Sequence, residues 1–283
     1  MTHHLEARGL SAGYDAAQVI DGLDLAILPG RITAIVGANA CGKSTLLRAL
    51  SRLLPPRAGQ VTLDGTPLSR IPPRRLAQVL GLLPQTPIAP EGITVSDLVA
   101  RGRNPHLGLF GRWTPRDEAA VTDALAATRT LDLADKAVDE LSGGQRQRVW
   151  IAMALAQQTE ILLLDEPTTY LDISHQIDVL DLLADLNRDR GTTIVMVLHD
   201  LNLAARYADH LIAMAQGGIH AQGAPETVLT AETVRAVFGL DSRIVPDPVS
   251  GRPMMLPIGR HRRAEGTAET LWTPPTGPPS RMR

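Results

Sequence analysis

The fold is decided by the stretch Gly37-Ala38-Asn39-Ala40-Cys41-Gly42-Lys43-Ser44-Thr45, which fits the pattern G-x-x-x-x-G-K-[ST]. The apolar run 32–36 before it predicts a buried strand, and residues 46–50 after it predict a helix. So tight a turn points backbone N–H groups at one spot in front of a helix N-terminus, which makes an anion site. The sequence therefore predicts a site for a nucleoside triphosphate.

Particular residues of this phosphate loop carry the expected chemistry. Two glycines allow backbone angles and close approaches that a Cβ would obstruct. Lys43 can reach the β- and γ-phosphates, and the hydroxyl of Ser44 can ligate Mg²⁺. The alternative, a Gly-rich turn that binds nothing, does not account for the motif together with both flanking elements. The residues expected to contact the nucleotide are Gly37, Asn39, Gly42, Lys43, Ser44 and Thr45.

Composition narrows the class of protein. The 283 residues have room for one large domain or two small ones, and 44% apolar residues suit a globular chain. A net charge of −2 argues against nucleic acid as a partner. The single cysteine, Cys41, cannot form an internal disulfide and indicates a reducing compartment. Since no apolar run approaches the roughly 20 residues of a membrane span, we expect a soluble chain that meets a membrane only through a partner.

The order of the elements indicates an α/β fold. The N-terminal part is β-rich, with Tyr14 expected in the loop between the first two strands, and the turn Asp64-Gly65 predicts a hairpin. Thr114 before Pro115 predicts a helix start. The expected strands are 5–10, 19–27, 31–36, 60–63, 79–83, 161–164 and 193–198. The main expected helices are 43–53, 115–129, 141–156 and 173–190.

No internal repeat is visible, so we expect one nucleotide-binding domain over residues 1–257. Its residues from about 86 to 157 read as a mostly helical subdomain. Residues 258–283 are rich in Arg, Pro, Thr and Gly with almost no apolar period, and we predict a disordered tail there.

Two buried strands are expected to end in polar residues. The unbroken apolar runs 161–164 and 193–198 are typical of strands covered on both faces of a parallel sheet. They lead into Asp165-Glu166 and His199, where an open α/β sheet holds its ligand. Because neighbours on a strand point to opposite sides, the two carboxylates can do different jobs. The structural alternative is an ion-pair rim.

A second Gly-rich helix start follows about 100 residues after the phosphate loop, as Leu141-Ser142-Gly143-Gly144-Gln145. It predicts another anion-facing surface with a hydroxyl donor. One chain has no obvious need for two such surfaces on one nucleotide, whereas two chains facing head to tail do. Here the sequence resembles the ATP-binding cassette (ABC) family, whose signature motif is LSGGQ. The resemblance covers residues 5 to about 257 and keeps the family's motif order.

The resemblance implies a P-loop NTPase core of mixed sheet and flanking helices, with an antiparallel β subdomain and an inserted helical subdomain. It also implies two ATP molecules sandwiched between two chains. Ser142, Gly143, Gly144 and Gln145 would then meet the nucleotide held by the partner's phosphate loop. The alanine at position 40 departs mildly from the family, where glycine is frequent.

The remaining roles come from the same resemblance. Asp165 would hold Mg²⁺, Glu166 would polarise the attacking water as general base, and His199 would contact the γ-phosphate. Gln85 matches the family's Q-loop, near the metal and the water. Two further residues match nucleotide and interface positions: Tyr14, which would stack on adenine unless it is a packed loop aromatic, and Asp172 of the D-loop.

Two stretches resemble one branch of the family, the importers of ferric siderophores, haem and cobalamin. They are residues 94–106 and 223–253. The first contains a small basic group, Arg101, Arg103 and His106. From the residues alone it would be a solvated surface, whereas the resemblance implies that this region contacts the permease. The branch implies a homodimer with two permease subunits, fed indirectly by a binding protein, at the cytoplasmic face of the inner membrane.

Three alternatives remain open at this point. An exporter ATPase would use the same chemistry, and only the two branch stretches speak against it. A cassette ATPase acting on ribosomes or DNA is disfavoured by the single cassette and the near-neutral charge. A regulatory module without catalysis is disfavoured because Lys43, Asp165, Glu166 and His199 are all present.

Overall fold

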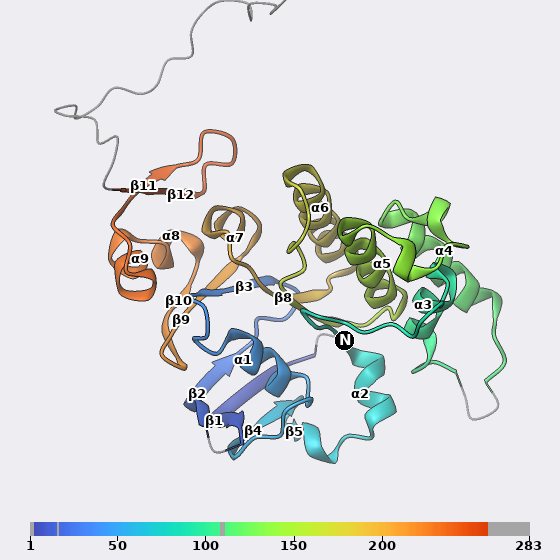
Figure 1. The fold of residues 1–283 in the computed structure, drawn as a ribbon. Coiled ribbons are helices and arrows are strands. Elements are labelled where there is room, and N and C mark those ends of the chain that lie inside the picture. The colour runs from blue at the N-terminus through green and yellow to red at the C-terminus, as the bar shows by residue number, and fades with distance from the viewer. Residues whose placement is uncertain (1–2, 16, 108–110, 260–283) are drawn as a thin grey trace, which may run out of the picture.

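A computed structural model of the chain describes residues 3–15, 17–107 and 111–259. At its centre is a six-stranded sheet whose neighbours pair in parallel, except for one antiparallel edge strand, β10 (Figure 1). Three of its four interior strands are buried along their whole length, which explains their mostly apolar sequences. In spatial order the strands are β10 (Gly218–Gly223), β9 (His210–Ala215), β3 (Ile32–Gly37), β8 (Thr193–Val197), β7 (Ile161–Asp165) and β6 (Leu80–Leu83).

A smaller antiparallel sheet packs beside this core. The helix α1 (Lys43–Leu50) shares one apolar cluster with strands of both sheets, so it joins them. The predicted hairpin at Asp64-Gly65 is present, with left-handed φ values of 51° and 76° at the two turn residues. In spatial order the strands are β2 (Ala17–Ala26), β1 (Leu5–Tyr14), β4 (Ala58–Leu63) and β5 (Thr66–Pro67).

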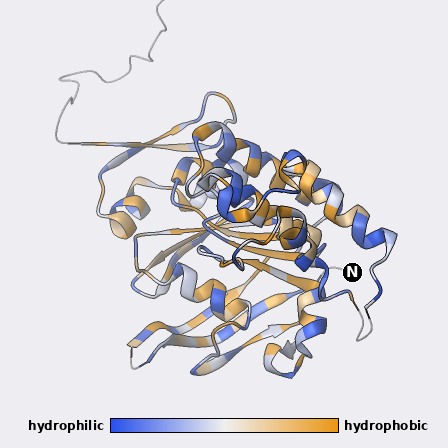
Figure 2. Ribbon diagram, turned by 45° about the vertical axis from the view of Figure 1, so that its right-hand side comes forward, coloured by the Kyte–Doolittle hydropathy of each residue, from blue (hydrophilic) through white to orange (hydrophobic). Residues whose placement is uncertain are grey.

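Most of the helical part is inserted in the sequence between the neighbouring strands β6 and β7. Figure 2 shows apolar strands in the middle of the molecule and helices with hydrophilic outer faces. The predicted start at Thr114 is a complete capping box with Asp117. The helices here are α2 (Pro73–Val79), α3 (Val95–Ala100), α4 (Pro115–Ala127) and α5 (Gly143–Ala156). Single 3₁₀ turns are η1 (Leu68–Arg70), η2 (Arg101–Arg103), η3 (Leu131–Leu133) and η4 (Val138–Glu140).

The C-terminal part covers the other end of the core sheet. Beside its helices lies a two-stranded hairpin, β11 (Ser242–Pro246) with β12 (Pro253–Pro257), which the sequence did not lead us to expect. In the part of the chain that the structure describes, no helix is both long and apolar enough to cross a membrane. The helices are α6 (Ile173–Arg190), α7 (Leu201–Tyr207), α8 (Pro225–Val228) and α9 (Ala231–Phe238).

Several sequence expectations need correction. Tyr14 is the last residue of β1 and does not lie in the following loop. The first helix ends at Leu50, three residues early, because Arg52 takes a left-handed φ of 64°. The predicted disordered tail falls mostly on residues 260–283, which lie outside the described residues. Its first residue is ordered, since the N–H of Ile258 donates to the carbonyl of Asp241.

The sequence predicted an exposed basic group of Arg101, Arg103 and His106, and this prediction is wrong for Arg103 and His106. Arg103 is 2% exposed and forms a salt bridge of 2.9 Å with Asp117. A ring nitrogen of His106 lies 2.8 Å from the carbonyl oxygen of Gln157. Both side chains are therefore bonded within the protein. Arg103 is buried, His106 is half-buried and Arg101 is exposed.

Candidate nucleotide site

The phosphate loop joins β3 to α1 and is shaped by close packing. A Cβ at Gly37 would lie 2.5 Å from the carbonyl oxygen of Met214 and 2.7 Å from Sγ of Cys41, so only glycine fits. Gly42 begins the helix with φ 108°. Ala40 also has a left-handed φ, of 61°. Such a φ strains an alanine, and the loop tolerates it here.

Lys43 already points across the loop. Its Nζ donates to the carbonyl oxygens of Gly37 and Ala38, both at 2.9 Å, and the side chain is 5% exposed. The loop's own carbonyls therefore hold the ammonium group at the mouth of the anion site. A phosphate arriving there gains a charge-assisted donor that is already ordered.

Asp165 lies at the carboxyl end of β7 and is 2% exposed. The hydroxyl of Ser44 donates to its Oδ1 at 3.0 Å. Burial raises the pKa of Asp165 above its ordinary value, the hydrogen bond from Ser44 lowers it, and the Glu166 charge raises it further. Such a carboxylate is costly unless a cation neutralises it, so hydroxyl and carboxylate together fit Mg²⁺. No cluster of three or more His, Cys, Asp or Glu residues occurs among the described residues, and Mg²⁺ does not require one.

Glu166 is the centre of a compact hydrogen-bonded group. Its Oε2 accepts from Nε2 of Gln85 at 2.7 Å and from Oγ1 of Thr169 at 3.1 Å. Its Oε1 lies 2.6 Å from Nε2 of His199. The Glu166 side chain is only 8% exposed, while that of His199 is 48% exposed. Thr169 had no predicted role, although it lies only three residues before Asp172 of the predicted D-loop.

The side chains of Asp165 and Glu166 point in different directions, as predicted, but the alternation of side chains along a strand is not the cause. Strand β7 ends at Asp165, and Glu166 has a left-handed φ of 55°. The backbone turn between them sends Asp165 to Ser44 and Glu166 to Gln85 and His199. The strained φ fits a residue whose position is set by function.

Most of these groups share one cleft. Asn39, Ala40 and residues 42–45 of the phosphate loop line a cavity of about 530 Å³ together with Val19, Gln85, Glu166 and His199. Asp165 is not among the lining residues and is hydrogen-bonded to one of them, Ser44. Tyr14 is not among its lining residues. Its ring is 39% exposed, with the guanidinium of Arg48 5.9 Å from the ring centroid.

The signature residues form a second, separate surface at the start of α5. Ser142 is the N-cap: its Oγ accepts from the N–H of Gln145, and its own N–H donates to Oε1 of Gln145. The capping bond uses an acceptor position of the Ser142 hydroxyl and leaves its O–H free to donate. Ser142 and Gly143 are exposed, and Gly144 and Gln145 are half-buried. None of the described signature residues lines the cleft.

Asp172 begins α6 in the same way. It caps the helix by accepting from the N–H of His175, and it also accepts from the hydroxyl of Ser174. These hydrogen bonds, with that from the His175 ring, lower the pKa of Asp172 to about 2. Its side chain is 66% exposed, so it remains available to another chain.

Fold and cleft together define a P-loop nucleoside triphosphatase. A family model described as ABC transporter matches residues 20–169. The chain is 54% identical to "Probable siderophore transport system ATP-binding protein YusV" of Bacillus subtilis (strain 168), over 89% of this chain and 92% of that protein. It is 55% identical to "Ferric enterobactin transport ATP-binding protein FepC" of Escherichia coli (strain K12), over 90% and 94%.

Solved structures agree with this. A metal-chelate type ABC transporter in an inward-facing conformation matches with a TM-score of 0.77 and 30% identity, over 92% of this chain and 98% of that one. A bacterial ABC transporter cassette solved as a dimer matches with a TM-score of 0.70 and 25% identity, over 78% and 98%. The chain belongs to the ABC transporter family. It is an ATP-binding, ATP-hydrolysing cassette, and the predicted fold class is confirmed.

Proposed function

We propose that this chain is the ATPase subunit of an importer that carries a ferric siderophore or a related iron chelate. The substrate class is supported by the sequence identity of this chain to its relatives. Identity is 50–55% to proteins named for transport of siderophores, ferric enterobactin, achromobactin and petrobactin. It is 39% to a protein named for cobalamin import, of which the chain covers 63%. A siderophore is therefore favoured over cobalamin.

Hydrolysis would be carried out by the group around Glu166. Its Oε1, beside Nε2 of His199, is the base that takes a proton from a water attacking the γ-phosphate. Lys43 and the loop N–H groups would bind the β- and γ-phosphates and stabilise the charge that develops there. Gln85 and Thr169 hold Oε2 from the other side, so the carboxylate cannot rotate freely.

Ser44 and Asp165 would hold Mg²⁺ at the cleft. When bound, the ion neutralises charge on the β- and γ-phosphates. Gln85 donates its amide N–H to Glu166, which leaves the amide oxygen free to face the ion or its water. Tyr14 would stack on adenine at the outer end of the site.

We infer that the site is completed by a second copy of the chain. The O–H of Ser142 and the N–H groups at the start of α5 are exposed, yet they lie outside the cleft of their own chain. Two chains facing head to tail would bring each signature to the partner's γ-phosphate. Asp172, capping α6 and exposed, would lie along that interface.

The permease would contact an apolar groove beside the Q-loop. This groove of about 420 Å³ is lined mainly by apolar side chains, among them Leu53, Leu76 and Leu82, and it ends at Pro84, next to Gln85. Leu53 is 65% exposed. Movement of a permease element in this groove would displace Gln85 and, through the hydrogen bond between them, Glu166. The chain would accordingly work at the cytoplasmic face of the inner membrane, with a binding protein delivering the substrate outside.

Capture from the native host tests this assignment. We expect the tagged Glu166→Gln chain, with ATP, to retain a many-span membrane protein at equal stoichiometry from mildly solubilised membranes. Leu53→Glu in the groove should reduce the capture, whereas Leu131→Glu, at an exposed apolar residue outside the groove, should not. Ribosomal or DNA-processing proteins in place of a membrane partner would overturn the proposal. A permease encoded without a binding protein would favour the exporter alternative.

A further inference from the structure

The C-terminal hairpin, defined as β11 and β12, packs on α7. This helix begins at Leu201, two residues after His199 (Figure 1). Asp200 between them caps the helix, accepting at Oδ1 from the N–H groups of Asn202 and Leu203. The backbone that carries His199 is therefore continuous with the first turn of α7. The position of His199 is therefore set from two sides, by the end of β8 at Val197 and by α7.

The first contact joins the side-chain amide of Asn202 to the backbone of Met255 on β12, with the pair of hydrogen bonds that a neighbouring strand would make. Oδ1 of Asn202 accepts from the N–H of Met255 at 2.7 Å, and its Nδ2 donates to the carbonyl of Met255 at 3.2 Å. Two bonds to one backbone unit set both the distance and the orientation of the helix against β12. Asn202 is the second residue of α7 and lies three positions after His199.

The second contact is an ion pair at the other end of α7. Nε and Nη2 of Arg206 donate to Oδ2 of Asp247, at 3.0 Å and 2.6 Å. The Asp247 side chain is 8% exposed and also accepts from the hydroxyl of Ser250 and the N–H of Val249. These two bonds, together with Arg206, lower the pKa of Asp247 to about 2. The carboxylate is thus ionised at every pH near neutrality.

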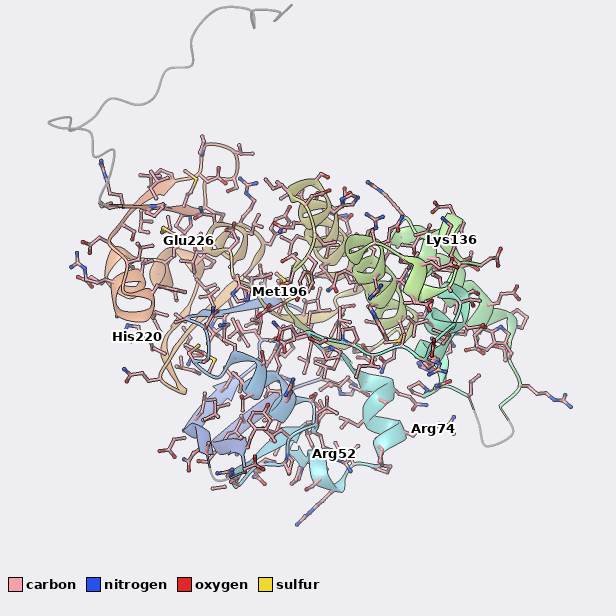
Figure 3. The ribbon with its side chains drawn as sticks, in the orientation of Figure 1. Arg52, Arg74, Lys136, Met196, His220 and Glu226 are labelled. Carbon is pink, nitrogen blue, oxygen red and sulfur yellow. The ribbon has the colours of Figure 1, made fainter. Side chains whose placement is uncertain are left out.

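The hairpin is itself fastened to the body of the protein. Its connecting loop holds Arg252, whose Nη1 donates to Oε1 of Glu226 on α8 at 2.7 Å; Figure 3 labels Glu226. Strand β11 also packs against α9. The hairpin therefore connects α7 to α8 and α9, and is not a loose appendage. By contrast, the imidazole of His199 is half exposed and meets Glu166 at its tip.

We propose that the C-terminal hairpin is a positioning element for hydrolysis: through Asn202 and Arg206 it holds α7 so that His199 stays against Glu166. The proposal rests on the role given to His199 in the proposed function. Asn202, Arg206 and Asp247 are then positioning residues, which contact neither the nucleotide nor the attacking water.

Turnover of ATP by the full chain, with thermal unfolding recorded in parallel, tests the proposal. Asn202→Ala and Asp247→Asn are each expected to lower kcat by about 10- to 100-fold, the loss that a misplacement near 1 Å causes. The KM for ATP should change less than twofold, because the phosphate loop is untouched. Arg206→Lys should restore part of the loss seen with Arg206→Ala. Arg188→Ala is the matched control, since it breaks exposed Arg–Asp pairs on α6 that involve neither α7 nor the hairpin.

A double-mutant cycle with His199→Ala separates positioning from general support. In the His199→Ala background, Asn202→Ala and Asp247→Asn should cause no further loss of kcat. An equal further loss, or unchanged kcat in the single variants while His199→Ala is impaired, would overturn the hairpin's role alone. Wild-type turnover by His199→Ala would overturn the role of His199 in the proposed function, and the inference with it.

Discussion

Glu166→Gln is expected to lower ATP turnover by about 10²- to 10⁴-fold, the contribution usual for a positioned general base. Glutamine has the shape of glutamate but cannot accept the proton of the attacking water. Its oxygen can still accept from Gln85 and Thr169, and its amide can donate to a neutral His199 ring, so the geometry of the cleft is retained. ATP binding should therefore remain within a few-fold of wild type.

Phosphate release measures the loss of turnover, and titration with a fluorescent ATP analogue measures whether ATP binding is retained. In the proposed dimer the two chains separate after hydrolysis, so the variant with ATP should also remain dimeric for longer on size-exclusion chromatography. Glu160→Gln is the matched control, being 53% exposed and outside the cleft. A loss of turnover below tenfold would mean that Glu166 is not the base, and loss of ATP binding would mean that the substitution disturbs the cleft.

Arg103→Met is expected to destabilise the fold by about 3–5 kcal/mol, the cost of leaving one partner of a buried ion pair alone. Nε of Arg103 donates to Asp117 at 2.9 Å, and Nη1 donates to the carbonyl of Ala156 at 2.8 Å. The two side chains are 2% and 7% exposed. Methionine fills much of the volume but leaves Oδ1 of Asp117 and the carbonyl oxygen of Ala156 without the donors that Arg103 supplies, while Oδ2 of Asp117 keeps its bonds from Thr114.

Urea denaturation measures this cost, and a shift of about 2–4 °C in Tm accompanies each kcal/mol in a domain of 150–250 residues. Arg103→Met with Asp117→Asn should be less destabilised than Arg103→Met alone, because the buried charge is gone. Hydrogen bonds from Thr114 and Arg103 hold the pKa of Asp117 below its ordinary value of 3.8. The pair's contribution is therefore present above that pH and lost as the pH falls below it. Wild-type stability of Arg103→Met would contradict the internal role of Arg103.

The phosphate loop, the polar strand ends and the capped helices could be predicted because each is encoded within a few residues. The loop needs only glycines between a strand and a helix, and Thr114 with Asp117 form their cap three positions apart. The apolar runs of β7 and β8 are buried on both faces, as their composition indicates. Motif order then gave the family, which the relatives confirm.

What escaped prediction depends on partners far along the chain. Arg103 looks like a solvated residue at a helix end until Ala156, 53 positions later, supplies its carbonyl. The C-terminal hairpin carries proline at both ends of β12, a poor strand signal, and it is held by Asn202 from 53 positions earlier. The divergence of Asp165 and Glu166 was predicted with the wrong cause, since a left-handed turn produces it.

Uptake of ⁵⁵Fe-labelled siderophores by the native host tests the central claim most directly. The chromosomal gene is replaced by alleles encoding Glu166→Gln, or Glu160→Gln as control, and cells are grown without added iron. Accumulation of at least one ferric siderophore should fall to the level of a gene deletion with Glu166→Gln and stay at wild type with Glu160→Gln. Unchanged accumulation of every ferric siderophore tested, in both the deletion and the Glu166→Gln strain, would contradict the account.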